Sequence, residues 1–246
     1  MIPQAIQNRT AFSASGAISL AASAPSENDP ATSIENTGYF SRVLKEDVGL
    51  AADILSDILQ NSRFSEDELI REKHVILQEI GASHDAPDDY VFDLFQEAAF
   101  EDQAIGRSIL GTTDSVESFT PDAIRAYMDR MYVGDRMVMS AAGNVDHDQL
   151  VDIAASKFPN LKTSGAPDPV EAKFTGGERR LNRDHEQAHI LIGVEGRPYH
   201  HDGFYASQIL SSILGGGMSS RLFQEVREKR GLCYSIFAFH WAFADT

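Results

Sequence analysis

Five residues in the second half of the chain match a pattern whose chemistry is zinc-dependent hydrolysis. His185-Glu186-Gln187-Ala188-His189 reads H-E-x-x-H, in which two histidines hold zinc and the glutamate activates water. The histidines can reach one ion only on a helix, because residues four apart on a strand lie roughly 13 Å apart. Residues 190–194 are short, rich in β-branched side chains and followed by Glu195-Gly196, which indicates a strand. We therefore interpret both histidines as residues at the entry of a buried strand.

A second candidate is a pair of glutamates earlier in the chain. Glu72 and Glu79 are seven residues apart, so on a helix they fall within roughly 20° of each other. They flank an apolar stripe of Leu69, Ile76 and Ile80. A carboxylate beside a core is costly unless a cation or hydrogen-bond donors satisfy it. Helix geometry leaves two interpretations open: a metal site, or glutamates that pair with Lys or Arg in solvent.

The elements that would position these residues alternate between helices and strands. The segment behind the predicted N-cap Ser65 is expected to be helical as far as Ile80, with Gly81 as its stop. Residues 159–177 combine Pro, Gly and polar residues without a period, which is typical of a linker. The remaining elements are predicted as helices at 46–60, 88–100, 121–131, 146–158, 202–214 and 219–229, and as strands at 38–44, 136–142, 189–194 and 233–243.

Composition excludes several classes of protein. The 246 residues carry a formal net charge of −16, so the chain repels phosphate backbones and nucleic acid is not an expected partner. Cys233 is the only cysteine in the sequence, which excludes an intrachain disulfide and a cysteine zinc cluster. No apolar run reaches the roughly 18–20 residues that a membrane span needs. Residues 1–24 resemble a weak secretory signal, so we expect a cytoplasmic protein, or a periplasmic or secreted one if that signal is real.

Several segments carry a family resemblance. They read TGYFSRVLKEDVGLAADILSDIL, REKHVILQEI, DDYVFDLFQEAAF, GRSILGT and GNVDHDQLV. Together they resemble the pitrilysin/insulinase, or inverzincin, family of zinc metallopeptidases, above all the branch of mitochondrial processing peptidase and its bacterial relatives. In that family H-x-x-E-H supplies two histidine ligands and the general base, and a later glutamate supplies the third ligand. The resemblance implies that Glu79 is this zinc ligand and that Glu72 supports the metal site.

The second half of the chain adds to the resemblance. GGGMSSRLFQEVREKRGLCYSI resembles the glycine-rich segment of the family and the turn after it. The resemblance implies that Arg227 and Tyr234 bind substrate near the scissile carbonyl. RDHEQAHILIGVEG resembles the start of the family's second domain, where Glu-Gln-x-His leads into a strand. The H-E-x-x-H match is then a coincidence created by His185.

The chain also departs from the family. No H-x-x-E-H occurs in the sequence, and by family spacing it should end near residue 3. Catalytic zinc needs about three protein ligands, and its water needs a proton acceptor. We therefore expect a chain that is truncated at both ends and inactive alone.

The expected fold class is α+β, with two related units. Each unit is a mainly antiparallel sheet covered by helices on one face; the first lacks its start and the second its end. Residues 1–30 are an atypical N-terminal segment, 31–158 the remainder of the first peptidase-like domain, 159–177 the linker, and 178–246 the truncated second domain.

Two hypotheses for function follow from the resemblance. In the first, the chain is a fragment of a zinc metalloendopeptidase that hydrolyses unstructured peptides. In the second, it is a non-catalytic, substrate-binding subunit that pairs with a related chain as a homo- or hetero-dimer. Zinc is the cofactor implied for the intact family enzyme. The DNA upstream of Met1 distinguishes the hypotheses, because an H-x-x-E-H encoded there supports the fragment.

Overall fold

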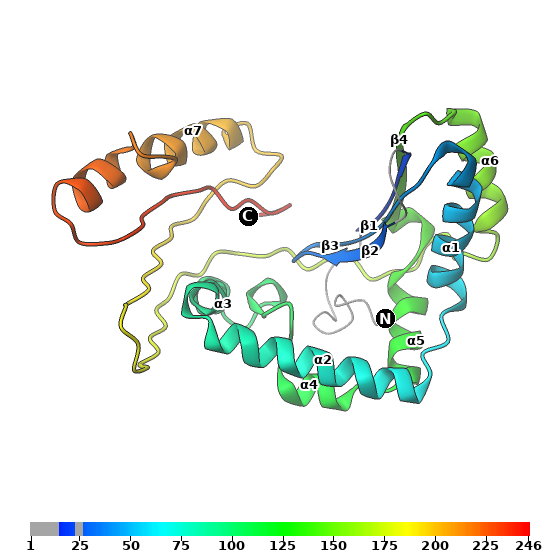
Figure 1. Ribbon diagram of the computed structural model, residues 1–246, viewed down its shortest axis with the longest axis horizontal. Coiled ribbons are helices and arrows are strands. Elements are labelled where there is room, and N and C mark those ends of the chain that lie inside the picture. Colours follow the sequence, from blue (N-terminus) through cyan, green and yellow to red (C-terminus); the bar gives the residue numbers. More distant parts are fainter. Residues whose placement is uncertain (1–14, 23–26) are drawn as a thin grey trace.

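A four-stranded sheet organises the first half of the chain. The computed structural model describes residues 15–22 and 27–246, so most of the signal-like segment at residues 1–24 lies outside the described residues. The strands are ordered β2-β3-β1-β4 across the sheet, with helices packed beside it (Figure 1). The strands are β1 (Ser15–Ala22), β2 (Glu27–Thr32), β3 (Asn36–Arg42) and β4 (Met137–Gly143).

The strands of this sheet are not mainly antiparallel, as the sequence analysis expected. β1 pairs in parallel with both β3 and β4, and β2 pairs antiparallel with β3. The prediction of a mainly antiparallel sheet is therefore wrong for the described strands. The physical reason is the connection between β3 and β4: helices carry the chain back across the sheet, and a helical crossover returns it in the same direction.

Most helices between β3 and β4 lie close to their predicted positions, but the six-residue helix at Thr113–Ser118 was not predicted. The crossover contains α1 (Val48–Asn61), α2 (Glu66–Asp85), α3 (Pro87–Ala99), α4 (Thr113–Ser118) and α5 (Pro121–Met131); α6 (His147–Lys157) follows β4. Ser65 is the N-cap residue of α2, although its side chain makes no capping hydrogen bond. α2 continues beyond Ile80 to Asp85, so Gly81 lies inside the helix and does not stop it.

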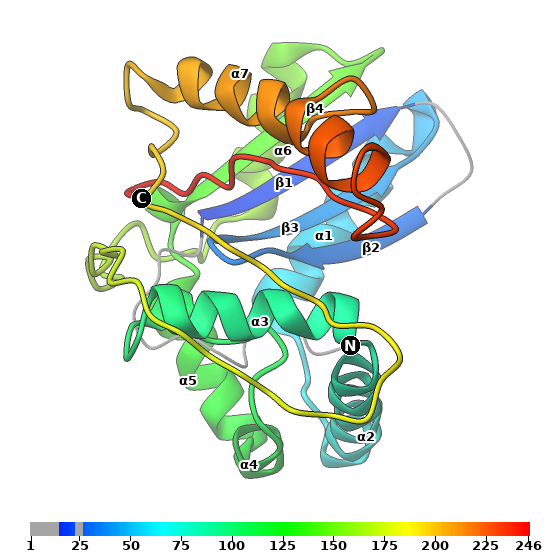
Figure 2. The same cartoon turned by 90° about the vertical axis from the view of Figure 1, so that its left-hand side faces the viewer.

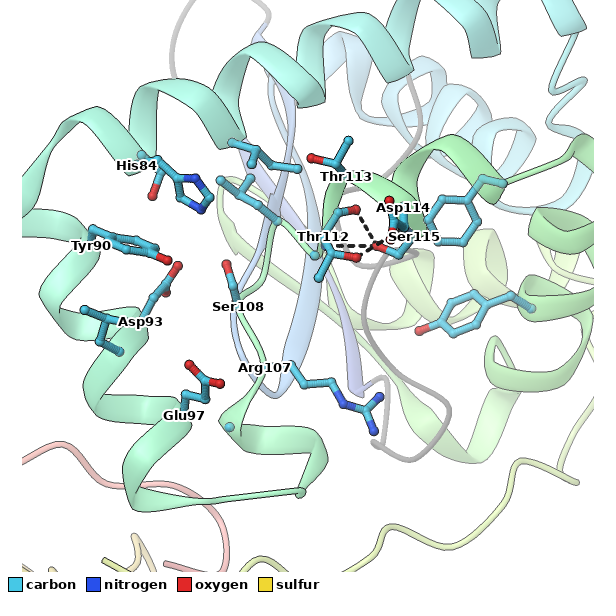
Figure 3. Close-up of a pocket in the computed structure, with 18 of the residues that line it drawn as sticks. His84, Tyr90, Asp93, Glu97, Arg107, Ser108, Thr112, Thr113, Asp114 and Ser115 are labelled. Carbon is cyan, nitrogen blue, oxygen red and sulfur yellow. Dashed lines mark hydrogen bonds between the residues drawn. The ribbon is translucent and has the colours of Figure 1, made fainter. Parts of the chain in front are cut away.

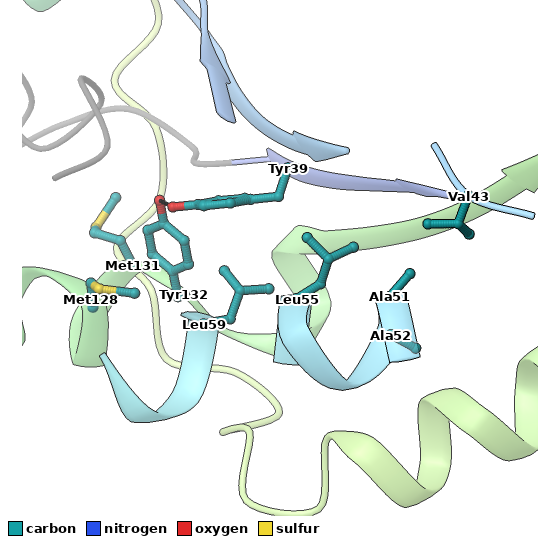
Figure 4. Packing of buried hydrophobic residues seen from close by; sticks show 9 residues of the cluster. All are labelled: Tyr39, Val43, Ala51, Ala52, Leu55, Leu59, Met128, Met131 and Tyr132. Carbon is teal, nitrogen blue, oxygen red and sulfur yellow. Dashed lines mark hydrogen bonds between the residues drawn. The ribbon is translucent and has the colours of Figure 1, made fainter. Parts of the chain in front are cut away.

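The main core lies between β3 and the helices on one face of the sheet. Along β3 buried and half-buried residues alternate, and Tyr39 points into the core (Figure 4). α1 contributes Leu55 and Leu59, and α5 contributes Met131. α6 packs on the same cluster through partly buried side chains. Helices therefore cover one face of this sheet, as the sequence predicts.

A buried pair of tyrosines joins the sheet to the end of α5. The hydroxyls of Tyr39 and Tyr132 lie 3.0 Å apart and share a hydrogen bond (Figure 4). Burial raises the pKa of both side chains, most strongly that of Tyr39, because an anionic phenolate would lose its hydration. Both rings therefore stay neutral and hold the sheet and α5 together over the physiological pH range.

The second half of the chain has helices but no strand ladder among its described residues. α7 (Phe204–Gly215) and a short π-helix (Phe223–Glu228) lie above α3, joined to the first half by long extended segments (Figures 1 and 2). Residues 189–194 and 233–243 are extended, but neither pairs with a neighbouring strand in the part of the chain that is described. The predicted strands at 189–194 and 233–243 are therefore wrong for the described chain, because a strand needs an extended partner beside it.

Candidate functional site

α2 presents the two predicted acidic residues beside its apolar stripe. Leu69, Ile76 and Ile80 are 5%, 3% and 6% exposed, so the predicted stripe is confirmed. Glu72 and Glu79 are both half-buried on the flank of this stripe. The structure thus confirms their position on the flank, and their roles at a metal site stay predictions.

The basic neighbours of the two glutamates have partners elsewhere. Arg71 pairs with Glu68 one turn earlier at 2.6 Å, and Lys73 donates to the carbonyl of Glu117 at 2.8 Å. The second contact ties α2 to α4. The flank that carries the glutamates is therefore fixed in place by polar contacts on its own helix and on its neighbour.

The described residues do not fit a catalytic zinc ion. A zinc site of this kind needs about three protein ligands with nitrogen, sulfur or oxygen donors. Among residues 15–22 and 27–246 no group of three or more His, Cys, Asp or Glu side chains is arranged to hold a metal. Glu79 offers one carboxylate, which is too few donors to hold catalytic zinc.

The H-E-x-x-H match lies in an extended segment. His185 and His189 are both exposed, and the residues around them are not helical. The backbone is therefore not helical, as the sequence predicts, and the interpretation of the match as a coincidence stays a prediction. The expected burial is wrong, however: Ile190 and Ile192 are 80% and 88% exposed.

Arg227 and Tyr234 are brought together as a unit. Arg227 lies on the π-helix, and its Nε donates to the carbonyl oxygen of Tyr234 at 2.8 Å. The guanidinium also pairs with Glu228 and lies 4.6 Å from the ring centre of Phe223. The ring of Tyr234 is 85% exposed. The hydrogen bond thus joins the Arg227 side chain, which is 34% exposed, to the backbone of Tyr234, while the ring of Tyr234 lies in solvent.

The structure does not bring this unit next to α2. Figures 1 and 2 place the π-helix above α3 and place α2 on the opposite side of α3. The predicted metal-site residues and the predicted substrate-binding residues are therefore two separate pairs in this chain.

A pocket that the sequence analysis missed opens between α2, α3 and the loop before α4. Its volume is about 880 Å³. Tyr90, Asp93 and Glu97 of α3 line one side, and Arg107 and Ser108 of the loop line another (Figure 3). The signal was present in the sequence, because residues 90, 93 and 97 share one face of a helix. The pocket therefore combines an acidic wall with a polar loop.

The polar loop is held by the start of α4. Thr112 is the N-cap residue of this helix, and its hydroxyl accepts a hydrogen bond from the amide of Ser115 at 3.2 Å. In return the hydroxyl of Ser115 accepts a hydrogen bond from the amide of Thr112 at 2.9 Å (Figure 3). Such reciprocal capping satisfies two amides that a helix start leaves open. The wall of the pocket at residues 112–115 is therefore locally rigid.

Comparison with protein-family models gives two matches that together cover most of the chain. Residues 10–113 match the model described as Insulinase (Peptidase family M16). Residues 118–246 match the model described as Peptidase M16 inactive domain. The first match begins at residue 10, inside the segment that the sequence analysis set apart as atypical.

Individual relatives agree with the family models. A protein of Rickettsia felis described as a zinc protease is 42% identical over 216 residues, which cover 87% of this chain and 52% of the relative. The chain thus spans about half the length of that relative.

Solved structures show the same fold. A protease from Helicobacter pylori covers 90% of this chain with a TM-score of 0.74 and 19% identity, over 55% of its own length. A chain of complex III2 from Candida albicans with Inz-5 bound covers 93%, with a TM-score of 0.67 and 18% identity, over 52% of its own length. Among the described helices, none is both long and apolar enough to cross a bilayer.

Proposed function

This chain belongs to peptidase family M16, and we propose that it is the part of such a zinc peptidase that holds an unstructured peptide without hydrolysing it alone. The observation that carries the proposal is the contact between Arg227 and Tyr234. The 2.8 Å hydrogen bond fixes the backbone at Tyr234, while the ring stays exposed for a ligand. The sequence meanwhile lacks H-x-x-E-H, so it lacks the residues that would activate water.

The absence of hydrolysis is tested directly. Incubate the purified chain with a quenched, unstructured peptide and zinc, and follow fluorescence. We expect no turnover. Turnover that survives purification and disappears with a chelator would contradict the proposal.

Peptide binding is tested with a matched pair of variants. Tyr234→Ala and Arg227→Gln should each weaken binding of the same peptide by about tenfold, which is the size expected for a central aromatic or arginine contact. Tyr205→Ala is the control, because Tyr205 is 77% exposed and lies on α7. Measure affinity by fluorescence anisotropy. Equal losses in the three variants would show that the effect is nonspecific.

A second candidate function is a non-catalytic subunit that binds substrate for a related chain. The sequence supports it by lacking H-x-x-E-H while keeping Arg227 and Tyr234. Sequencing the DNA upstream of Met1 separates the two functions. An H-x-x-E-H encoded there, in frame or after a frameshift, supports the fragment of an enzyme. If none is encoded there, the non-catalytic subunit is supported, with zinc supplied by its partner.

A further inference from the structure

α7 carries no charged residue and exposes apolar side chains to solvent. Its sequence reads FYASQILSSILG, and residues 203–220 around it contain no Asp, Glu, Lys or Arg. Tyr205, Ile209 and Ile213 recur every four residues and are 77%, 61% and 62% exposed. A helix that presents apolar side chains in place of charges is normally covered by another element. This α7 stripe (Tyr205, Ile209 and Ile213) is therefore a candidate contact surface.

The extended segment beside α7 contacts a different side of the helix. The ring of Phe204 lies 5.4 Å from the ring of His240, and the carbonyl of Gly215 accepts a hydrogen bond from the amide of Ala238 at 3.2 Å. At about 100° per residue, Ile209 lies roughly 120–140° around the helix axis from Phe204 and Gly215. The α7 stripe therefore points away from this segment, which runs along one side of the helix in Figure 1.

The α7 stripe is complementary to a second copy of itself. Tyr205 and Ile213 lie on either side of Ile209 at equal spacing. When two copies of α7 pack antiparallel about a two-fold axis at Ile209, Tyr205 of one copy meets Ile213 of the other. The two Ile209 side chains then meet at the axis. The same packing separates the nearest like charges, because the two Asp202 side chains lie about 21 Å apart along the helix axis.

The distribution of charge favours contact through this part of the chain. Residues 178–246 contain eight basic and eight acidic residues, so their net charge is zero and the −16 of the chain lies in residues 1–177. Two copies that meet through α7 therefore bring neutral regions together and keep the acidic regions apart. An anionic membrane or a nucleic acid does not suit the stripe, because residues 203–220 offer no Lys or Arg.

We propose that two copies of this chain associate through the α7 stripe as a two-fold symmetric dimer. The stripe does not include Arg227 or Tyr234, so the inference goes beyond the proposed function and does not rest on it. One helix pair is small for a specific interface, and we expect a dissociation constant of roughly 10–100 μM. Below that concentration the chain is a monomer whose α7 is exposed.

Sedimentation equilibrium measures this association over a protein concentration of about 1–300 μM. We expect a single equilibrium between monomer and dimer in the original chain. A chain that stays monomeric throughout the range would overturn the proposal. An open-ended series of larger species would also overturn it, since a two-fold contact closes at two copies.

A charge at the two-fold axis tests the position of the contact. Ile209→Glu places two carboxylates opposite each other, so the dissociation constant should rise by about tenfold or more. Ile70→Glu on α2 is the matched control, because Ile70 is 64% exposed and gains the same charge. Its dissociation constant should stay within about twofold of the original. Equal weakening in the two variants would show a general effect of charge and would overturn the contact at α7.

A complementary variant tests the symmetry of the contact. Ile209→Lys alone should associate as weakly as Ile209→Glu, because two ammonium groups then meet at the axis. An equimolar mixture of the two variants should form a heterodimer, with a dissociation constant about tenfold below that of either variant alone, since opposite charges then face each other. Circular dichroism of each variant checks that it is folded. A mixture of folded variants that associates no better than the separate variants would overturn the two-fold contact at Ile209.

Discussion

Residues 36–158 and residues 178–246 carry similar apolar patterns and use them differently. In the first region β3 buries Tyr39 to 4% exposure against α1 and α5. In the second, the alternating residues Ile190, Ile192 and Val194 are 80%, 88% and 83% exposed. The difference shows that periodically spaced apolar side chains stabilise a segment only when another element buries them.

α7 shows the same contrast among helices. Tyr205, Ile209 and Ile213 recur at helical spacing and are 77%, 61% and 62% exposed. On α5, Ile124 and Met131 recur at a similar spacing and are completely buried. Exposed side chains at this spacing contribute little to the free energy of unfolding of the described chain.

The largest expected effect tests this contrast directly. Ile124→Ala should lower the free energy of unfolding by about 2–5 kcal/mol, because it leaves a cavity beside Leu69. Ile209→Ala, on α7, should change it by about 0.5 kcal/mol or less. Measure both by urea denaturation. Similar losses would show that α7 is covered in solution, and the comparison would fail.

The buried tyrosine pair gives the next largest effect. Tyr132→Phe should cost about 1–3 kcal/mol, because it leaves the hydroxyl of Tyr39 without its partner. The exposed Tyr199→Phe is the control. Urea denaturation measures both variants. A double variant with Tyr39→Phe that costs no more than either single change would confirm that the two hydroxyls act together.

The same pair predicts a pH dependence. Burial raises the pKa of both tyrosines above the ordinary value, so the unfolded chain loses these protons first. Their stabilisation is complete below about pH 10 and declines as the pH rises above it. Thermal melts at pH 9–11 should show a steeper decline in the original chain than in the double Phe variant. Parallel curves would mean that the rings ionise in the folded chain.

A glycine in the second region sharpens the comparison, because it brings the end of α7 into tight contact with the backbone at Ala238. A Cβ on Gly215 would lie 2.2 Å from the amide nitrogen of Ala238, whereas Gly217 has nothing within 4 Å. Gly215→Ala should therefore speed hydrogen exchange at residues 237–239, at a cost of about 1–3 kcal/mol of local stability. Gly217→Ala should leave this exchange unchanged, and an equal effect would contradict the contact.

The smallest expected effect concerns zinc. Replacing His185 and His189 together with Gln should leave zinc affinity unchanged, because both lie on an extended, exposed segment. Isothermal titration with zinc measures it. A large loss of zinc affinity would show that these histidines bind zinc. It would also mean that the second region contains a zinc site despite its extended backbone.

Much of the first region could be predicted from sequence. The longer helices between β3 and β4 carry clear apolar stripes, so their existence followed from local pattern, whereas the six-residue α4 was not predicted. β1 was missed because its sequence, SGAISLAA, has only two strongly apolar residues and gives little period. The parallel pairing was missed because it depends on contacts between distant segments, which no local pattern encodes.

Single residues of the candidate site could be predicted from the sequence, but the pocket could not. The positions of Glu72 and Glu79 beside a stripe followed from helical spacing, and the Arg227 and Tyr234 pair followed from the family resemblance. The pocket was missed because its walls come from α2, α3 and a loop that meet only after folding. The exposure of residues 190–194 was also missed, since burial depends on a neighbour rather than on the segment itself.

The position of β1 has a consequence for how the chain reaches its native state. β1 lies between β3 and β4, and its residues pair both with Asn36, 21 positions later, and with Met137, more than a hundred positions later. Closing such a long loop is slow, because its entropy is lost before the contact forms. During synthesis β1 leaves the ribosome before β3 and β4. The backbone groups of β1 that pair with β4 therefore lack their partner until β4 has been made. That waiting period is when this chain is most exposed to aggregation and to chaperones.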